Sequence, residues 1–135
     1  DAPVCIAELY AAPPEKIPSF LFNDPHIPAA QAMFSLPEDP EAIPAHVAQN
    51  VWNLGCAGKF LWPIPDHGLR NRLHRISVPV LILWGEQDRL VPAVYAKEFA
   101  GGISNCTVCV LENCGHILQM EKLGETVEQV SKFLA

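Results

Sequence analysis

The chain has 135 residues, half of them hydrophobic and 18% charged, which fits one folded domain and argues against a disordered chain. Its formal net charge of −6 disfavours a nucleic-acid partner, because binding to phosphates needs clustered Lys and Arg. No apolar run approaches the ~20 residues that span a bilayer, no basic and apolar leader is visible, and the five cysteines are typical of reduced thiols, so we expect a cytoplasmic protein without a membrane partner.

The first half of the sequence is rich in proline. Eleven of the 13 prolines fall within the first 65 residues, and only Pro79 and Pro92 come later. Between the early prolines, apolar residues at helical spacing predict three short helices, over residues 27–35, 44–54 and 67–75. Helices with such apolar and aromatic faces must cover something, either a small core of their own or part of a larger fold.

The second half has a different pattern. The apolar run over residues 78–84, ended by a glycine, predicts a strand buried on both faces of a parallel sheet. A helix over residues 93–100, closed by two glycines, and a second strand over residues 106–111 follow. Apolar residues at i, i+4, i+7 and i+11 then predict an amphipathic last helix: Leu123, Val127, Val130 and Leu134. This order predicts an α/β fold with a right-handed parallel crossover.

An acidic and a basic side chain follow the two predicted strands. Asp88 comes just after the first strand, in GEQDRLVP, and His116 comes just after the second, in NCGH. Because functional groups collect beyond the carboxyl ends of parallel strands, we expect these two side chains to meet. A carboxylate on one imidazole nitrogen fixes the tautomer and stabilises the imidazolium formed at the other. Taken singly, Asp88 is equally typical of a helix cap and His116 of a surface residue.

The stretches that carry these residues, RLHRISVPVLILWGEQDRLVP and ENCGHILQMEKLGETVEQVSKFL, resemble the C-terminal part of the α/β-hydrolase family. In that family, a G-x-x-D loop carries the acid and a Gly-His pair carries the general base of a Ser-Asp-His triad. The resemblance therefore implies that Asp88 is the catalytic acid and His116 the general base. Glu86 stands two residues too early to be the acid. Met120 and Glu121 correspond to the opening of the family's last helix.

The resemblance also implies how the chain is organised. Residues 1–76 correspond to the family's helical lid or cap, and residues 77–135 to the C-terminal strand–helix–strand–helix part of its core. The nucleophile motif G-x-S-x-G is absent, and none of the five serines has flanking glycines. We therefore expect the nucleophile outside this chain, an inactive chain on its own, a small and partly apolar substrate, and no cofactor or metal. An open edge on the first strand predicts a homo-oligomer or an amino-terminal partner segment.

Other interpretations of the chain stay open. Three aromatic residues are candidates for lining a substrate groove, although packing against a core explains them equally well: Trp52, Phe60 and Trp62. A chain without a nucleophile is also compatible with a non-catalytic protein that binds a ligand or a partner. Four residues have zinc-type side chains at close spacing: Cys106, Cys109, Cys114 and His116. Against zinc, the first two cysteines are three residues apart in a predicted strand and would face opposite sides.

Overall fold

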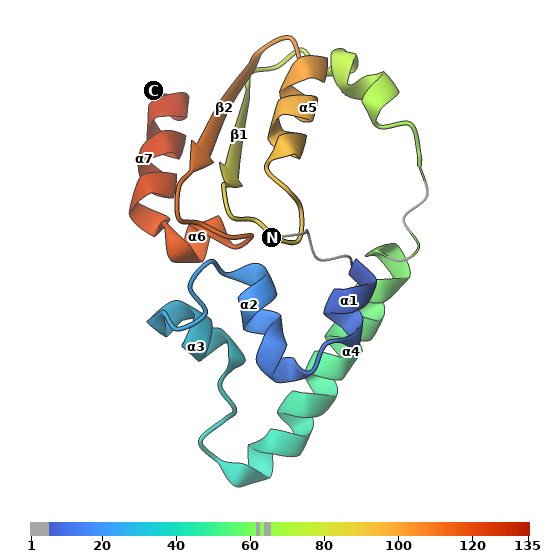
Figure 1. Ribbon diagram of the computed structural model, residues 1–135, viewed down its shortest axis with the longest axis vertical. Coiled ribbons are helices and arrows are strands. Elements are labelled where there is room, and N and C mark those ends of the chain that lie inside the picture. The colour runs from blue at the N-terminus through green and yellow to red at the C-terminus, as the bar shows by residue number, and fades with distance from the viewer. Residues whose placement is uncertain (1–5, 62, 64–65) are drawn as a thin grey trace.

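The computed structural model describes residues 6–61, 63 and 66–135. Figure 1 shows two groups of elements, helices from the first half of the chain and a sheet with flanking helices from the second half. The first group, here called the amino-terminal helices, spans residues 6–61 and contains α-helices and short 3-10 helices: α1 (Ile6–Ala11), η1 (Pro14–Lys16), α2 (Ile17–Leu21), α3 (Pro28–Phe34), η2 (Pro40–Ala42) and α4 (Ile43–Leu61). The predicted boundary at residue 76 stays a prediction.

Proline opens most of these helices. Pro14, Pro18, Pro28 and Pro40 each occupy one of the first two helical positions, where a missing backbone N–H leaves no hydrogen bond unmade. The helix predicted over residues 27–35 is present as α3. The helix predicted over 44–54 is longer, because its glycines do not end it.

The extension of α4 has a packing reason. Gly58 of α4 lies against the ring of Tyr10 from α1, so that a side chain there would approach the ring at 3.8 Å. Gly55, the first residue after the predicted range, faces open space and keeps its helical conformation. The contact with α1 therefore stabilises a helix whose sequence alone predicts an earlier end.

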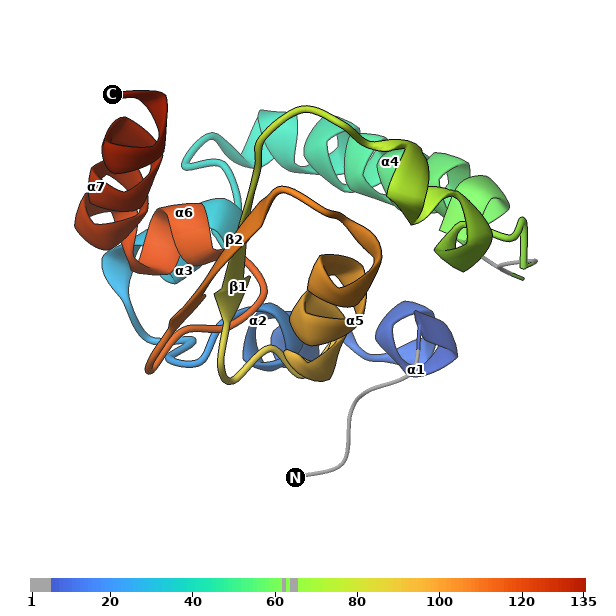
Figure 2. The same ribbon diagram turned by 90° about the horizontal axis from the view of Figure 1, so that it is seen from above.

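The sheet has two parallel strands, β1 (Val80–Gly85) and β2 (Cys106–Leu111), paired from Val80 with Cys106 to Gly85 with Leu111. β1 begins two residues later than predicted. Pro79 has no N–H to donate, and the N–H of Val80 makes the first bond, to the Asn105 carbonyl at 2.9 Å. Figures 1 and 2 show α5 (Val94–Gly102) and α7 (Leu123–Leu134) on opposite sides of the two strands.

Three expectations for the second half are corrected. The helix predicted over residues 67–75 is a 3-10 helix, η3 (Arg70–Arg75). Helix α5 continues through its two glycines. At Gly102 the helix backbone packs closely against Leu73 of η3, because a side chain at that position would come within 2.7 Å of Leu73. The residues expected to open the last helix form a separate turn, α6 (Leu118–Glu121), since Lys122 leaves the helical region with φ −129° and ψ 48°.

The buried residues lie where the elements meet, and both halves of the chain contribute to them: Phe22, Ala30, Leu73, Ala96, Ile103, Leu111 and Cys114. Residues Val80 to Trp84 of β1 are only half-buried, which differs from the expected burial on both faces. The described residues give this strand a single neighbouring strand, so one edge of it stays open. None of the described helices combines the length and the hydropathy that a bilayer-spanning segment requires.

Candidate active site

The loop after β1 is a tight turn built around Asp88. Its Oδ1 accepts hydrogen bonds from the backbone N–H groups of Leu90 at 2.9 Å and Val91 at 2.8 Å. The ring N–H of Trp84 donates to the Val91 carbonyl at 2.9 Å and ties the end of the turn to the strand. Asp88 is only 9% exposed, and these bonds leave its Oδ2 for another partner.

The loop after β2 passes directly over this turn. A side chain at Gly85 would collide with the carbonyl oxygens of Cys114 and Gly115, so the crossing requires a bare backbone at that position. Gln87 holds the crossing on both sides of Cys114. The backbone N–H of Gln87 donates to the Cys114 carbonyl, and the side-chain Oε1 of Gln87 accepts from the Cys114 N–H, both at 2.9 Å.

His116 reaches Asp88 at this crossing. The distance between His116 Nδ1 and Asp88 Oδ2 is 2.8 Å, within hydrogen-bond reach as expected from the sequence. Because an ionised carboxylate only accepts, Nδ1 carries the proton and Nε2 of the neutral imidazole is left as an acceptor. The hydrogen bonds of the described residues include none to Nε2. The two side chains line a hollow of about 140 Å³ with four other residues: Leu83, Trp84, Gly85 and Leu118.

Electrostatics separates His116 from its neighbour Cys114. The hydrogen bond and the charge of Asp88 raise the pKa of His116 above its ordinary value of 6.5, and partial burial opposes this shift. Burial, with the nearby carboxylate of Glu121, raises the pKa of the Cys114 thiol to about 11. A buried thiol that stays protonated is a poor nucleophile and a poor metal ligand. Of the two side chains, only the imidazole is suited to exchange protons near neutral pH.

The other candidate residues lie elsewhere. Trp52 and Phe60 on α4 are 70% and 82% exposed and do not line the hollow beside His116, while Trp62 lies outside the described residues. Their contact with a substrate stays a prediction. Glu86 accepts a hydrogen bond from the side chain of Gln87 at 2.6 Å. The proposed zinc ligands are not gathered, because the described part of the chain holds no group of three or more His, Cys, Asp or Glu side chains placed for a metal.

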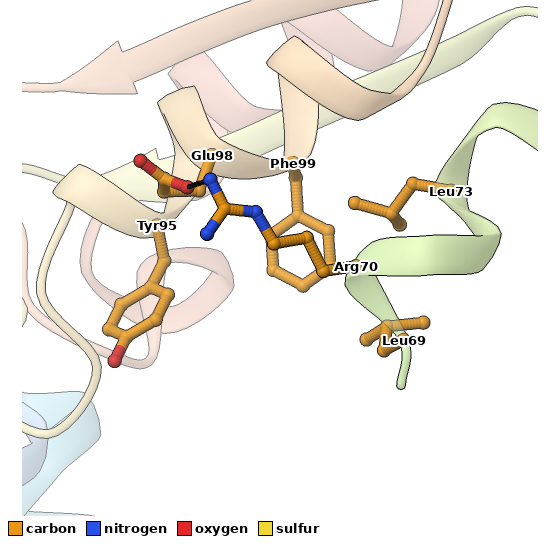
Figure 3. Close-up of a pocket in the computed structure, with 6 residues that line it drawn as sticks. All are labelled: Leu69, Arg70, Leu73, Tyr95, Glu98 and Phe99. Atoms are coloured by element: carbon orange, nitrogen blue, oxygen red, sulfur yellow. Dashed lines mark ion pairs between the residues drawn. The ribbon is translucent and has the colours of Figure 1, made fainter. Parts of the chain in front are cut away.

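A wider groove of about 270 Å³ lies between η3 and α5, away from the pair (Figure 3). Its walls are largely apolar and include Leu69, Leu73, Tyr95 and Phe99. In Figure 3 the Arg70 side chain reaches toward Glu98, with 3.5 Å between Nη2 and Oε2. Both of these charged side chains are exposed, so the ion pair contributes little to stability. The groove shares no residue with the hollow at His116 and is not part of this site.

Sequence reasoning did not identify three groups that hold the site. These are the side chain of Gln87, the carboxylate of Glu121, and the backbone carbonyl of Leu21, which accepts from the His116 N–H at 2.8 Å. Glu121 was noted only for its place in the family's last helix. Every residue has a backbone carbonyl, so the sequence does not indicate which one will accept a bond. The role of a glutamine in a loop also cannot be predicted from its residue type alone.

The architecture and this pair define a class of protein. A sequence model of the alpha/beta hydrolase fold matches residues 30–123, and the chain belongs to this family. It is 39% identical over 69 residues to the monoacylglycerol lipase ABHD6 of Homo sapiens, covering 51% of this chain and 20% of the relative. A 2-hydroxy-6-oxononadienedioate/2-hydroxy-6-oxononatrienedioate hydrolase of Pseudomonas putida is 44% identical over 57 residues, covering 42% and 19%.

The solved structures agree on the fold. An esterase from Exiguobacterium antarcticum superposes with a TM-score of 0.67 at 20% identity, over 96% of this chain and 46% of that protein. At this identity the likeness concerns the fold alone. The chain spans about a fifth of the length of the curated relatives it matches.

Proposed function

We propose that this chain supplies the acid, Asp88, and the general base, His116, of a Ser-Asp-His triad, with the nucleophile outside the chain. The observation that supports this most directly is the 2.8 Å hydrogen bond between His116 Nδ1 and the buried Asp88, which leaves Nε2 facing no partner among the described side chains. Asp88 would fix the imidazole tautomer and stabilise the imidazolium. Nε2 would take the proton of the attacking hydroxyl and return it to the leaving group.

The proposed substrate is a small molecule with an apolar part and a hydrolysable bond. Three of the residues around the hollow at His116 are apolar side chains: Leu83, Trp84 and Leu118. The relatives include a monoacylglycerol lipase, and the name of its substrate describes an acyl ester of glycerol. We therefore propose ester hydrolysis as the reaction to test first.

The open edge of β1 is suited to pairing with another strand. An open hollow of about 320 Å³ runs along this strand and is lined by its own residues together with Phe99 and Ile103. A half-buried strand with an unpaired edge associates with other strands. We propose that an amino-terminal segment of the protein, or a second copy of this chain, pairs there. Light scattering of the 135-residue chain at low micromolar concentration tests this, and a stable monomer of that chain would contradict it.

The decisive experiment uses the complete protein that contains this chain. His116→Ala should lower kcat for a p-nitrophenyl ester by about 10²–10⁴, the range of general acid–base catalysis. His74→Ala removes an exposed histidine of η3 and serves as the matched control, with kcat expected to stay near that of the wild type. Near-normal turnover in His116→Ala would reject the proposed role.

A further inference from the structure

One carboxylate joins the histidine loop to the amino-terminal helices. Glu121 of α6 uses both of its oxygens as acceptors. Oε2 accepts from the N–H of Gly115 at 2.5 Å, and Oε1 accepts from the N–H of Asp24 at 3.0 Å. Gly115 directly precedes His116, and Asp24 lies in the turn between α2 and α3. A single side chain is therefore bonded to two backbone segments that are about ninety residues apart in the sequence.

The two segments also touch through their backbones. The Leu21 carbonyl accepts from the N–H of His116 at 2.8 Å and from that of Ile117 at 3.3 Å. A side chain at Gly115 would come within 2.7 Å of the Asn23 nitrogen, so neither segment leaves room for the other to shift. In Figure 1 the turn after α2 lies against the segment that leads into α6. Phe22, which lies between Leu21 and Asn23, is buried.

We propose that Glu121 is a positioning residue, which couples the placement of the amino-terminal helices to the orientation of His116. The coupling follows from the geometry. Gly115 is joined to His116 by a peptide bond, and its N–H donates to the charged carboxylate of Glu121. Such a hydrogen bond is stronger than one to a neutral acceptor. Any displacement of the turn at Asp24 pulls on the same carboxylate and on the Leu21–His116 bond. The imidazole then loses its alignment with Asp88 Oδ2.

Only the predicted effect of Glu121 on catalysis rests on the proposed function. The physical link between Glu121 and the two backbone segments is measurable without any substrate. This allows the two ideas to fail independently.

The test compares Glu121→Gln with Glu125→Gln in the complete protein that contains this chain. The first change keeps the side-chain size but turns one acceptor oxygen into a donor facing an N–H. The second removes the same charge from an exposed residue four positions later, whose carboxylate pairs with Lys122 at 3.5 Å. Hydrogen exchange at the amides of Gly115, Asp24 and His116 should rise on the order of tenfold in Glu121→Gln and stay near wild type in Glu125→Gln. The proton resonance of His116 Nδ1–H should weaken only in the former.

A second variant covers the case in which Glu121→Gln does not fold. Glu121→Asp keeps the charge and shortens the arm by one methylene, so the same three amides should exchange faster. In the complete enzyme, either Glu121 variant should lower kcat with little change in KM, because substrate contacts are untouched while the base is misaligned. Unchanged exchange and an unchanged Nδ1 proton signal would overturn the inference. Full activity of His116→Ala would overturn the proposed function and leave the exchange result standing.

Discussion

The two loops that form the site are held in opposite ways. In the loop after β1, Asp88 satisfies the N–H groups of residues two and three positions later, and its own N–H donates to the Gly85 carbonyl at 3.3 Å. All of these bonds join residues within a few positions of one another. The Asp88 carboxylate is therefore placed by bonds within its own turn, although the neighbouring Gln87 N–H and Arg89 side chain also donate to the carbonyls of Cys114 and Ser19.

In the loop after β2, three consecutive backbone donors are satisfied by groups outside the loop, two of them far away along the chain. Cys114 donates to Gln87, Gly115 donates to Glu121, and His116 donates to the Leu21 carbonyl. Asn113, with φ of 52°, adds a left-handed turn that few residues adopt readily. The base is thus placed by three other parts of the molecule. The difference teaches that His116, rather than Asp88, is the member of the pair whose geometry responds to changes elsewhere in the protein.

The largest expected effect removes the charge of the locally held acid. Asp88→Asn keeps an Oδ1 that accepts from Leu90 and Val91, so the turn should persist, but it presents an amide to His116 and favours the wrong tautomer. In the complete enzyme, kcat should fall by about 10²–10⁴ with little change in the thermal midpoint of unfolding. Steady-state kinetics and calorimetry on the same samples check both parts. A large loss of stability would show that the turn depends on the charge.

A steric change tests the remotely held loop. Gly115→Ala adds a methyl group within 2.7–2.9 Å of three backbone atoms in residues 21–23, and should reduce the free energy of unfolding by about 1–3 kcal/mol. Gly124→Ala is the matched control, because nothing lies within 4 Å of its added methyl group and the position is helical. The control should stabilise the chain by up to about 1 kcal/mol. Chemical denaturation measures the free energy of unfolding of both variants. Equal changes in the two variants would contradict a tight contact between Gly115 and residues 21–23.

A polar change separates the two loops without crowding them. Gln87→Met removes the acceptor of the Cys114 N–H and leaves that part-buried donor unpaired, which should cost about 1–2 kcal/mol of unfolding free energy. Gln49→Met is the control, since this glutamine of α4 is exposed and its side chain donates to the exposed side chain of Asn53. The control should change stability by less than about 0.5 kcal/mol. If Gln87→Met reduced the free energy of unfolding as little as the control, the Gln87 side chain would not be needed to hold the two loops together.

The smallest expected effect is a dependence of stability on pH. The pKa of His116 in the folded chain lies above its ordinary value of 6.5, mainly because of the bond to Asp88. The resulting stabilisation is fully present below about pH 6.5 and is lost as the pH rises through the higher, folded-state pKa. The effect should be modest, because the His116 side chain is 37% exposed. Denaturant titrations of wild type and His116→Gln from about pH 5 to pH 9 should show a stability difference that shrinks with rising pH. A difference in stability that does not change with pH would contradict the raised pKa of His116.

The second half of the chain was largely predictable, and the first half was not. The strand predicted over residues 106–111 is β2, and the amphipathic helix predicted from the apolar residues between Leu123 and Leu134 is α7, although the residues expected to open it form α6 instead. Continuous apolar runs and helical periodicity describe such elements directly. In the first half, α1 and α2 were not predicted, and α4 extends well beyond its expected end. Short helices separated by prolines depend on what they pack against, as Gly58 does on Tyr10.

The sequence by itself determined the family, the order of the C-terminal elements and the meeting of Asp88 with His116, because parallel strands bring their carboxyl ends to one edge of a sheet. The bonds from Asp88 to the N–H groups of residues two and three positions later fit the capping role for which aspartate is typical. Only the tertiary structure decided what holds His116. Its supports are a glutamine amide, the carboxylate of Glu121 and the carbonyl of Leu21, and the last comes from a segment that lies far away along the chain. Such bonds exist only after distant segments have packed together, and a backbone carbonyl is the same group at every residue.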